Sequence, residues 1–307
     1  MSFSYIRNSS PGTKITFAVV LLICFFVFFS FSGFLLAMTL YKISMTELMT
    51  LLSDLQNTDQ THILKFMQIY QATGIFIVSP LCIVWLLEYH PLRYLYAQNA
   101  PTSKNILLVM AIILCILPLV NFLAWLNNAV EFPSCLTSLE SWMRSKEQTA
   151  EDLTRLFLTM NSRSDLWINI LMISVIPALG EELLFRGLLQ RLFCDFFKNI
   201  HIAIITSAIL FSAIHLQFFG FFPRMMLGLI FGYMLAWSEN FWLPVIAHFS
   251  NNFMAVLAHY FLSEEQITKN IDHFGIEPQT AIWTVLSTVL VLFLMYQLKC
   301  NNRTKTC

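Results

Sequence analysis

Long apolar runs dominate this sequence of 307 residues and limit the folds that it can adopt. A helix needs about 20 residues to cross the hydrocarbon core of a bilayer, and eight runs are candidates, although the fourth and the sixth are short. They are residues 15–41, 66–89, 106–126, 166–180, 200–216, 225–237, 241–262 and 281–298. Lipid offers no partners to free backbone groups, and the runs lack the alternation of barrel strands, so they must be helices. The sequence therefore predicts an all-α fold, a polytopic membrane helix bundle with about eight transmembrane helices.

The composition agrees with this prediction and excludes several classes of protein. Hydrophobic residues make up 57% of the chain and charged residues 12%, about half of the roughly 25% charge of an ordinary soluble protein. This composition argues against a soluble globular enzyme. Eighteen basic residues balance eighteen acidic ones, so the protein has no net positive field to attract nucleic acid. The seven cysteines show no C-x-x-C spacing, which argues against a disulfide scaffold or a zinc ribbon.

The chain has no repeat, linker or low-complexity tract, so we expect residues 1–307 to form a single membrane domain. The first run is too long for the apolar part of a signal peptide and should remain as an anchor. With eight spans, more than half of the basic residues lie inside if both termini are cytoplasmic, which favours an N-in, C-in topology. Residues 136–157 form an amphipathic stretch, which predicts a short interfacial helix. The G-x-x-x-G spacing of Gly228 and Gly232 predicts close helix packing.

Ionisable residues within or near apolar runs are costly and call for a reason. Pro177 and Gly180 interrupt the fourth run just before Glu181 and Glu182, so we expect this acidic pair at a kink or in the first turn of a new helix. Glu182 and Arg186 have the i, i+4 spacing of an ion pair. Glu181 would point about 100° away and is the freer carboxylate, available as a general base. Equally, these three residues could be interfacial charges that end a span.

Two further polar pairs follow on later runs. His215 comes four residues after Phe211 near the end of the fifth run, a place where a lone histidine is usually an interfacial residue. His248 and Asn252 are i and i+4 in the middle of the seventh run, so their side chains share one face of a helix. Asn251 lies about 100° around the helix and is expected to point away from this pair. Hydrogen bonding between packed helices is the alternative role for these polar groups.

Together, the ordered motifs Glu-Glu-x-x-x-Arg, Phe-x-x-x-His and His-x-x-x-Asn resemble those of the CPBP family, the CAAX prenyl protease and bacteriocin-processing (Abi) intramembrane proteases. The motifs cover residues 181–252, within a catalytic core expected at residues 166–262. The resemblance implies an intramembrane endopeptidase in a bacterial plasma membrane that acts on a membrane-associated or lipidated peptide or protein.

The resemblance also implies a role for each motif residue. Glu181 and His215 would activate a water molecule, and His248 and Asn252 would stabilise the oxyanion, with Glu182 and Arg186 in support. A carboxylate in an apolar cavity is suited to accept a proton, and hydrogen-bond donors in a pocket of low dielectric stabilise developing charge. We therefore expect a glutamic-type mechanism that requires no cofactor.

A metal-dependent mechanism is the second possibility, because the family is often labelled metalloprotease and Glu181, His215 and His248 could bind zinc. The sequence has no H-E-x-x-H motif, so the metal-free mechanism ranks first. Two other classes of function stay open. One is a non-catalytic scaffold or bacteriocin-immunity protein of the same fold, and the other is an ion- or proton-coupled transporter. The absence of an inverted partner set of polar residues in the first three runs counts against the transporter.

Overall fold

The computed structural model describes residues 4–53, 60–160 and 162–302, and within these ranges it contains helices and no strands. This confirms the predicted all-α class. The α-helices are α1 (Ser4–Arg7), α2 (Pro11–Tyr41), α3 (Met45–Ser53), α4 (Thr61–Ala72), α5 (Ser79–Leu87), α6 (Pro91–Tyr94), α7 (Ser103–Cys115), α8 (Leu117–Asn128), α9 (Thr137–Leu158), α10 (Arg163–Asn169), α11 (Ile176–Glu182), α12 (Gln190–Phe197), α13 (Ile200–Ala213), α14 (Phe221–Ser238), α15 (Trp242–Phe261), α16 (Glu264–Ile267) and α17 (Ala281–Asn302). Shorter 3₁₀ and π-helical segments join or interrupt them.

Five helices among the described residues are long and apolar enough to cross a membrane, or six if the bent pair α7 and α8 forms one span. They are Pro11–Tyr41, Thr61–Leu87, Arg163–Phe197, Phe218–Ser238 and Ala281–Asn302. The structure thus shows a polytopic helix bundle but does not confirm the predicted count of eight spans. The two remaining candidates are α13, which has only 14 residues, and α15, which carries polar residues along its 20-residue length.

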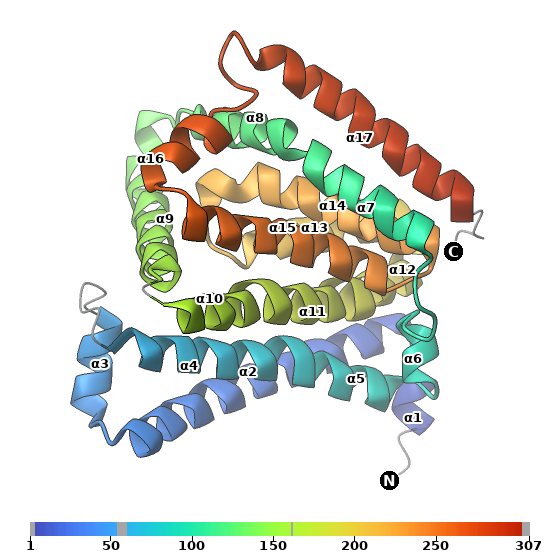
Figure 1. Cartoon of the computed structure of the whole chain (residues 1–307). Coiled ribbons are helices and arrows are strands. Elements are labelled where there is room, and N and C mark those ends of the chain that lie inside the picture. The colour runs from blue at the N-terminus through green and yellow to red at the C-terminus, as the bar shows by residue number, and fades with distance from the viewer. Residues whose placement is uncertain (1–3, 54–59, 161, 303–307) are drawn as a thin grey trace.

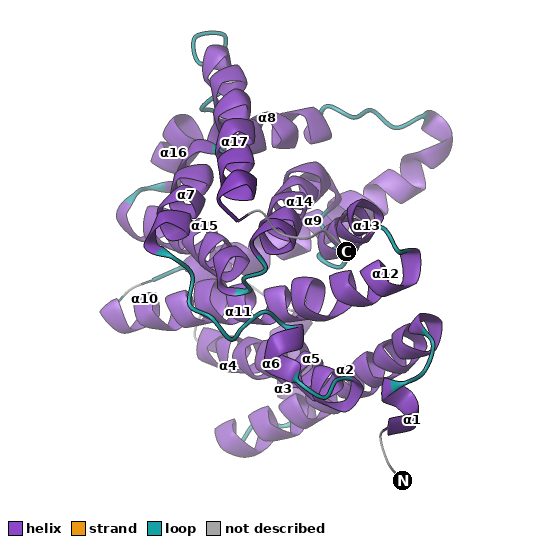
Figure 2. Cartoon of the chain, turned by 90° about the vertical axis from the view of Figure 1, so that its right-hand side faces the viewer, coloured by secondary structure: helices purple, strands orange, loops and turns teal. Residues whose placement is uncertain are grey.

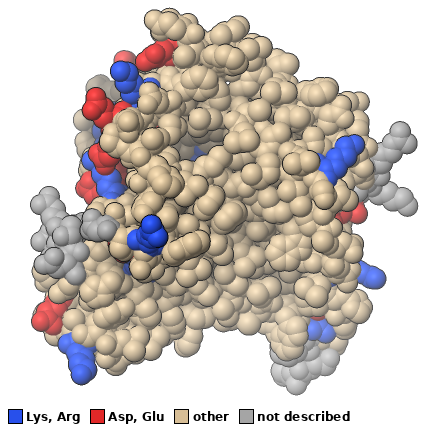
Figure 3. All heavy atoms as spheres, in the orientation of Figure 1, with Lys and Arg blue, Asp and Glu red and all other residues tan. Residues whose placement is uncertain are grey.

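The surface of the bundle matches a lipid environment. Large apolar side chains such as Phe28 and Phe31 of α2 and Leu292 of α17 are more than half exposed. Figure 3 shows charged side chains mainly along two opposite edges of the molecule, with a broad uncharged band between them. Such a band is too large and apolar for a protein surface in water.

One long helix occupies the centre of the bundle. The segment Arg163–Phe197 runs continuously through α10, α11 and α12. It lies between the layer of α2, α4 and α5 and the group of α13, α14 and α15 (Figures 1 and 2). It contains two π-helical segments, Ile170–Val175 and Leu183–Leu189. This segment positions most of the polar residues that the motifs identify.

The acidic pair lies within this continuous helix, so the predicted alternative of a new helix that starts at the pair was wrong, whereas the alternative of a kink stays a prediction. The backbone on both sides of α11 has right-handed helical geometry. Pro177 has no N–H for the carbonyl of Ile173, one turn earlier. The side chain of Asn252 donates to this carbonyl instead, at 2.9 Å. A neighbouring helix thus satisfies the group that the proline leaves free, which is how proline is tolerated within membrane helices. The positive end of a helix dipole does not act on the acidic pair.

The two glycines of the G-x-x-x-G spacing are buried where α14 packs along α13. A Cβ atom on Gly228 would lie 3.1 Å from the Cβ of Ala208, and one on Gly232 would lie 2.8 Å from Cγ2 of Ile204. The predicted role in close packing is confirmed.

The amphipathic stretch at 136–157 forms the single helix α9, which has 22 residues. It is longer than the short helix predicted and packs against the 3₁₀ turn Phe218–Gly220. There the rings of Trp142 and Phe218 lie 5.3 Å apart. Its position at a membrane interface stays a prediction.

Candidate active site

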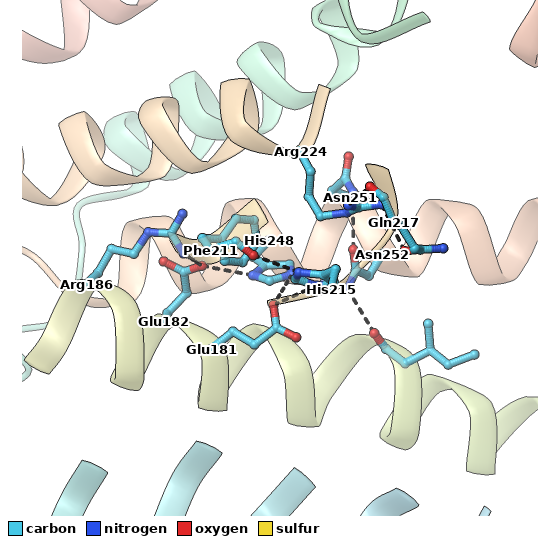
Figure 4. Close-up of polar contacts among 11 residues, drawn as sticks. Glu181, Glu182, Arg186, Phe211, His215, Gln217, Arg224, His248, Asn251 and Asn252 are labelled. Atoms are coloured by element: carbon cyan, nitrogen blue, oxygen red, sulfur yellow. Dashed lines mark hydrogen bonds and ion pairs between the residues drawn. The ribbon is translucent and has the colours of Figure 1, made fainter. Parts of the chain in front are cut away.

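A buried network of charges connects three helices at the centre of the bundle (Figure 4). One oxygen of Glu182, Oε1, accepts hydrogen bonds from Nη1 of Arg186 at 2.8 Å and from Nδ1 of His248 at 2.9 Å. The side chains of Glu182 and Arg186 are 0% and 1% exposed. Arg186 also donates to the carbonyl of Gly228 at 3.1 Å and lies over the ring of Phe211. The predicted i, i+4 pair is present, and it also holds His248 in place.

Glu181 points away from this network, as the helical rotation predicts. Its Oε2 atom lies 3.8 Å from Nε2 of His248 and 4.0 Å from Nε2 of His215. Its side chain is 14% exposed and lines a cavity. The two adjacent carboxylates therefore have different surroundings. That of Glu182 is buried and paired, and that of Glu181 is accessible to a molecule bound in the cavity.

The hydrogen bonds of the two histidines fix which ring nitrogens carry protons. Nδ1 of His215 lies 2.7 Å from the carbonyl oxygen of Phe211, which can only accept, so Nδ1 must be protonated. Nδ1 of His248 likewise donates to the carboxylate of Glu182. In neutral rings, both Nε2 atoms then present lone pairs toward Glu181. Three acceptors converge on one spot, and a water molecule can donate hydrogen bonds to two of them at once.

The cavity has a volume of about 510 Å³ and brings together the residues that the three motifs place on separate helices. Glu181, His215, His248 and Asn252 all line it, whereas Glu182 and Arg186 do not. The C-terminal part of α9 contributes to the wall through Thr154 and Phe157. The cavity is therefore large enough to admit a peptide segment beside Glu181.

Asn251 also lines the cavity, which corrects the expectation that it points away. Its Nδ2 atom donates to Oδ1 of Asn252 at 3.2 Å. The cavity extends around α15 far enough to include both amides, and helical rotation alone could not show this extent.

Arg224 lines the same cavity, and no sequence motif identifies it. Its guanidinium donates to the backbone oxygen of Gln217 at 3.2 Å and to the side-chain oxygen of Gln217 at 2.9 Å. A single arginine next to an apolar run resembles the many interfacial arginines that end spans. Only the fold shows that it turns inward.

The three atoms that could bind zinc are Nε2 of His215, Nε2 of His248 and a carboxylate oxygen of Glu181. Their chemistry suits zinc, and each imidazole donates its other N–H to an acceptor, as metal-bound histidines do. However, within the described part of the chain no three His, Cys, Asp or Glu side chains are close enough to hold an ion. As arranged here, the residues do not fit a metal.

Comparison with known proteins identifies the family of this region. Residues 163–254 match the family described as Type II CAAX prenyl endopeptidase Rce1-like. The matched segment contains all three motifs, and the match confirms the resemblance to the CPBP proteases.

One similar protein is the "Uncharacterized protein YpbD" of Bacillus subtilis (strain 168). It is 29% identical over 85 residues, which cover 26% of this chain and 40% of that protein. No solved structure matches. The comparisons therefore show a match to a CAAX protease family over residues 163–254 of this chain.

Proposed function

We propose that the Rce1-like domain at residues 163–254 makes this chain an intramembrane endopeptidase that hydrolyses a peptide bond of a membrane-associated or lipidated peptide or protein. The observation that supports this best is the position of the Glu181 carboxylate, which faces the cavity beside the Nε2 atoms of two histidines. A carboxylate and an imidazole that share one water molecule are the groups required to activate it as a nucleophile.

In this mechanism a water molecule lies between Glu181 and His215. Nε2 of His215 accepts one hydrogen bond and orients the water, and Glu181 removes its other proton as the oxygen attacks the carbonyl carbon of the substrate. The C–N bond then breaks, and Glu181 returns the proton to the departing amine. Desolvation in the apolar cavity strengthens each of these interactions.

The oxyanion formed by this attack requires hydrogen-bond donors. One N–H of the Asn252 amide is bound to the carbonyl of Ile173, and the other N–H is available to the oxyanion. His248 can donate through Nε2 only when its ring is protonated, because Nδ1 already donates to Glu182. The hydrogen bond to Glu182 holds the imidazole of His248 in one orientation, which gives the buried ion pair a role in the reaction.

The substitution Glu181→Gln tests the general base, because it removes the base and keeps the shape. The assay uses full-length protein in detergent, fluorescence-quenched peptides and one farnesylated peptide as substrates. We expect turnover to fall by about 10²- to 10⁴-fold with an unchanged melting temperature. Full activity of this variant would contradict the mechanism.

The matched control is Glu182→Gln, the same change at the adjacent residue. It leaves Arg186 without its buried partner and should reduce the free energy of unfolding by about 3–5 kcal/mol. Thermal unfolding of both variants therefore separates loss of the base from loss of the fold.

Two further outcomes distinguish the alternatives. Loss of activity with a chelator and its recovery with zinc alone would replace the metal-free mechanism with a zinc-dependent one. Wild-type protein that folds and cleaves none of the peptides would favour a scaffold or immunity protein. We propose a bacterial plasma membrane as the location, with both termini in the cytoplasm.

A further inference from the structure

Arg224 holds a positive charge in the wall of the cavity, where it interacts electrostatically with the carboxylates of Glu147 and Glu181 but forms a close ion pair with neither. Its two hydrogen bonds go to neutral oxygens of Gln217. In the described part of the chain it forms no ion pair with any carboxylate. The acidic side chain of Glu147 instead accepts the backbone N–H of Phe219 at 3.0 Å.

Arg224 does not stabilise α14 through the helix dipole. Arg224 lies in the first turn of the helix, where the helix dipole disfavours cations. A cation near the apolar part of a membrane is also costly unless it is paired. The position of Arg224 thus suggests that an anion binds there during function.

The guanidinium is held in one orientation. Gln217 binds two of its nitrogens, and a Cβ atom on Gly220 would lie 2.6 Å from Nη2. Gly220 therefore provides the space that the guanidinium occupies. The remaining N–H groups of the arginine are free to bind a planar anion, and a carboxylate fits their geometry best.

We propose that Arg224 binds a carboxylate of the substrate and so positions the scissile bond next to Glu181. This proposal rests on the proposed endopeptidase function, because both residues line the same cavity. The carboxylate could belong to the C-terminus of a peptide or to an acidic side chain close to the cleaved bond. The chemistry of recognition is the same in both cases.

Two pairs of fluorescence-quenched apolar hexapeptides distinguish these sources. One pair differs only in a free C-terminal acid or an amide, and the other has an amidated C-terminus and an internal Glu or Gln. KM and kcat are measured with wild-type protein and with the variants Arg224→Gln, Arg224→Lys and Gly220→Ala. The control is Arg155→Gln, which removes an exposed positive charge of α9 that does not line the cavity.

We expect wild-type protein to prefer the acidic member of at least one pair. Arg224→Gln should raise KM for that peptide on the order of 10- to 100-fold relative to its neutral counterpart, and any change in kcat that follows from the loss of the charge near Glu181 should be the same for both peptides. Arg224→Lys should recover part of the preference. Gly220→Ala should reduce it although the charge remains, and Arg155→Gln should leave it unchanged.

Equal losses for acidic and neutral peptides in Arg224→Gln, or no preference in wild-type protein, would overturn the proposal. If wild-type protein cleaves no peptide, the endopeptidase function fails, and binding of the same peptides is measured by thermal shift. Stabilisation by the acidic peptide that disappears in Arg224→Gln would then still support recognition of a carboxylate. Equal shifts, or none, would contradict it.

Discussion

Glu181 and Glu182 are neighbours in the sequence, yet their carboxylates have different partners. Glu182 is fully buried against Arg186 and His248, whereas Glu181 faces the cavity. The i, i+4 spacing and the rotation of about 100° per residue are sufficient to predict this division. The roles that we propose for the two residues, a positioning anion and a base, follow from that geometry.

Asn252 has two roles that experiments can separate: a structural hydrogen bond to a neighbouring helix and a proposed hydrogen bond to the oxyanion. It donates to the carbonyl of Ile173 within the helix that contains Pro177, and it faces the cavity. If its free N–H stabilises the oxyanion, Asn252→Ala should lower kcat on the order of 10²- to 10³-fold with little change in KM. Steady-state kinetics and thermal unfolding of the same preparation test this expectation.

Asn251 is not a suitable control for this experiment, because it lines the same cavity and donates to Asn252. Asn105→Ala is a better one. Its amide donates to Asn302 at 2.9 Å, and it does not line the cavity. A pure KM effect of Asn252→Ala, or an activity loss that follows its loss of stability, would mean that the residue only packs the bundle.

Sequence spacing predicts those contacts of the site that form between side chains of one helix. Spacing places Glu182 beside Arg186, and His248 one turn from Asn252. Spacing could not show that His248 shares an oxygen with Arg186, or that Arg224 turns into the cavity. Those contacts depend on how separate helices face each other.

At the scale of elements, the long helix Arg163–Phe197 shows why the prediction of a new helix at the acidic pair was wrong. Proline and glycine end helices in water, where the freed backbone groups bind solvent. Here the π-helical segment Ile170–Val175 and the amide of Asn252 accommodate Pro177 within the helix. The continuous helix therefore depends on a residue from α15, which no local pattern reveals.

The packing of α13 against α14 leads to a prediction about Gly232. A methyl group there would lie 2.8 Å from both Ile204 and the side chain of Gln190. Alanine favours helices over glycine by about 1 kcal/mol, but overpacking costs about 1–3 kcal/mol. We expect Gly232→Ala to lower the melting temperature of the protein in detergent.

Gly12→Ala is the matched control, because the added Cβ on Gly12 would lie an ordinary 3.7 Å from its nearest neighbour, Phe196. Gly12 also lies in a helix, α2, so the gain in helix propensity acts alone. Equal melting temperatures for Gly232→Ala and Gly12→Ala would show that α13 and α14 can separate slightly without cost.

At the scale of the whole molecule, the helical class and the membrane environment were predictable because lipid leaves a chain few alternatives. The number of spans was harder to predict. α15 packs against several other helices and so does not need the uniform apolarity of a helix that faces lipid, whereas α13 buries one face against α12 and α14 and exposes Ile202, Ile205 and Ile209 on the other. Protein neighbours take the place of lipid around much of α15, and hydropathy alone does not distinguish these two surroundings.

The orientation of the bundle decides from which side a substrate reaches the cavity. Figure 1 shows α1 and the last turn of α17 at one end of the bundle, and α9 and α16 at the other. Among the described residues, the first end carries Arg7, Arg93 and Lys299, and the second end carries Lys42, Arg144 and Lys146. In the proposed topology, with both termini inside, the first end faces the cytoplasm. The cavity, whose wall includes part of α9, then lies toward the outer side.

Two exposed cysteines allow this topology to be tested. Cys135 lies just before α9, and Cys300 lies in the last turn of α17. In variants that keep only one of these cysteines, a membrane-impermeant maleimide should label Cys135 in intact cells and Cys300 only after permeabilisation. The reverse pattern would invert the bundle and bring the cavity to the cytoplasmic side. Labelling of both cysteines in intact cells would contradict the placement of the two ends on opposite sides of the membrane, because both ends would then be accessible from outside the cell.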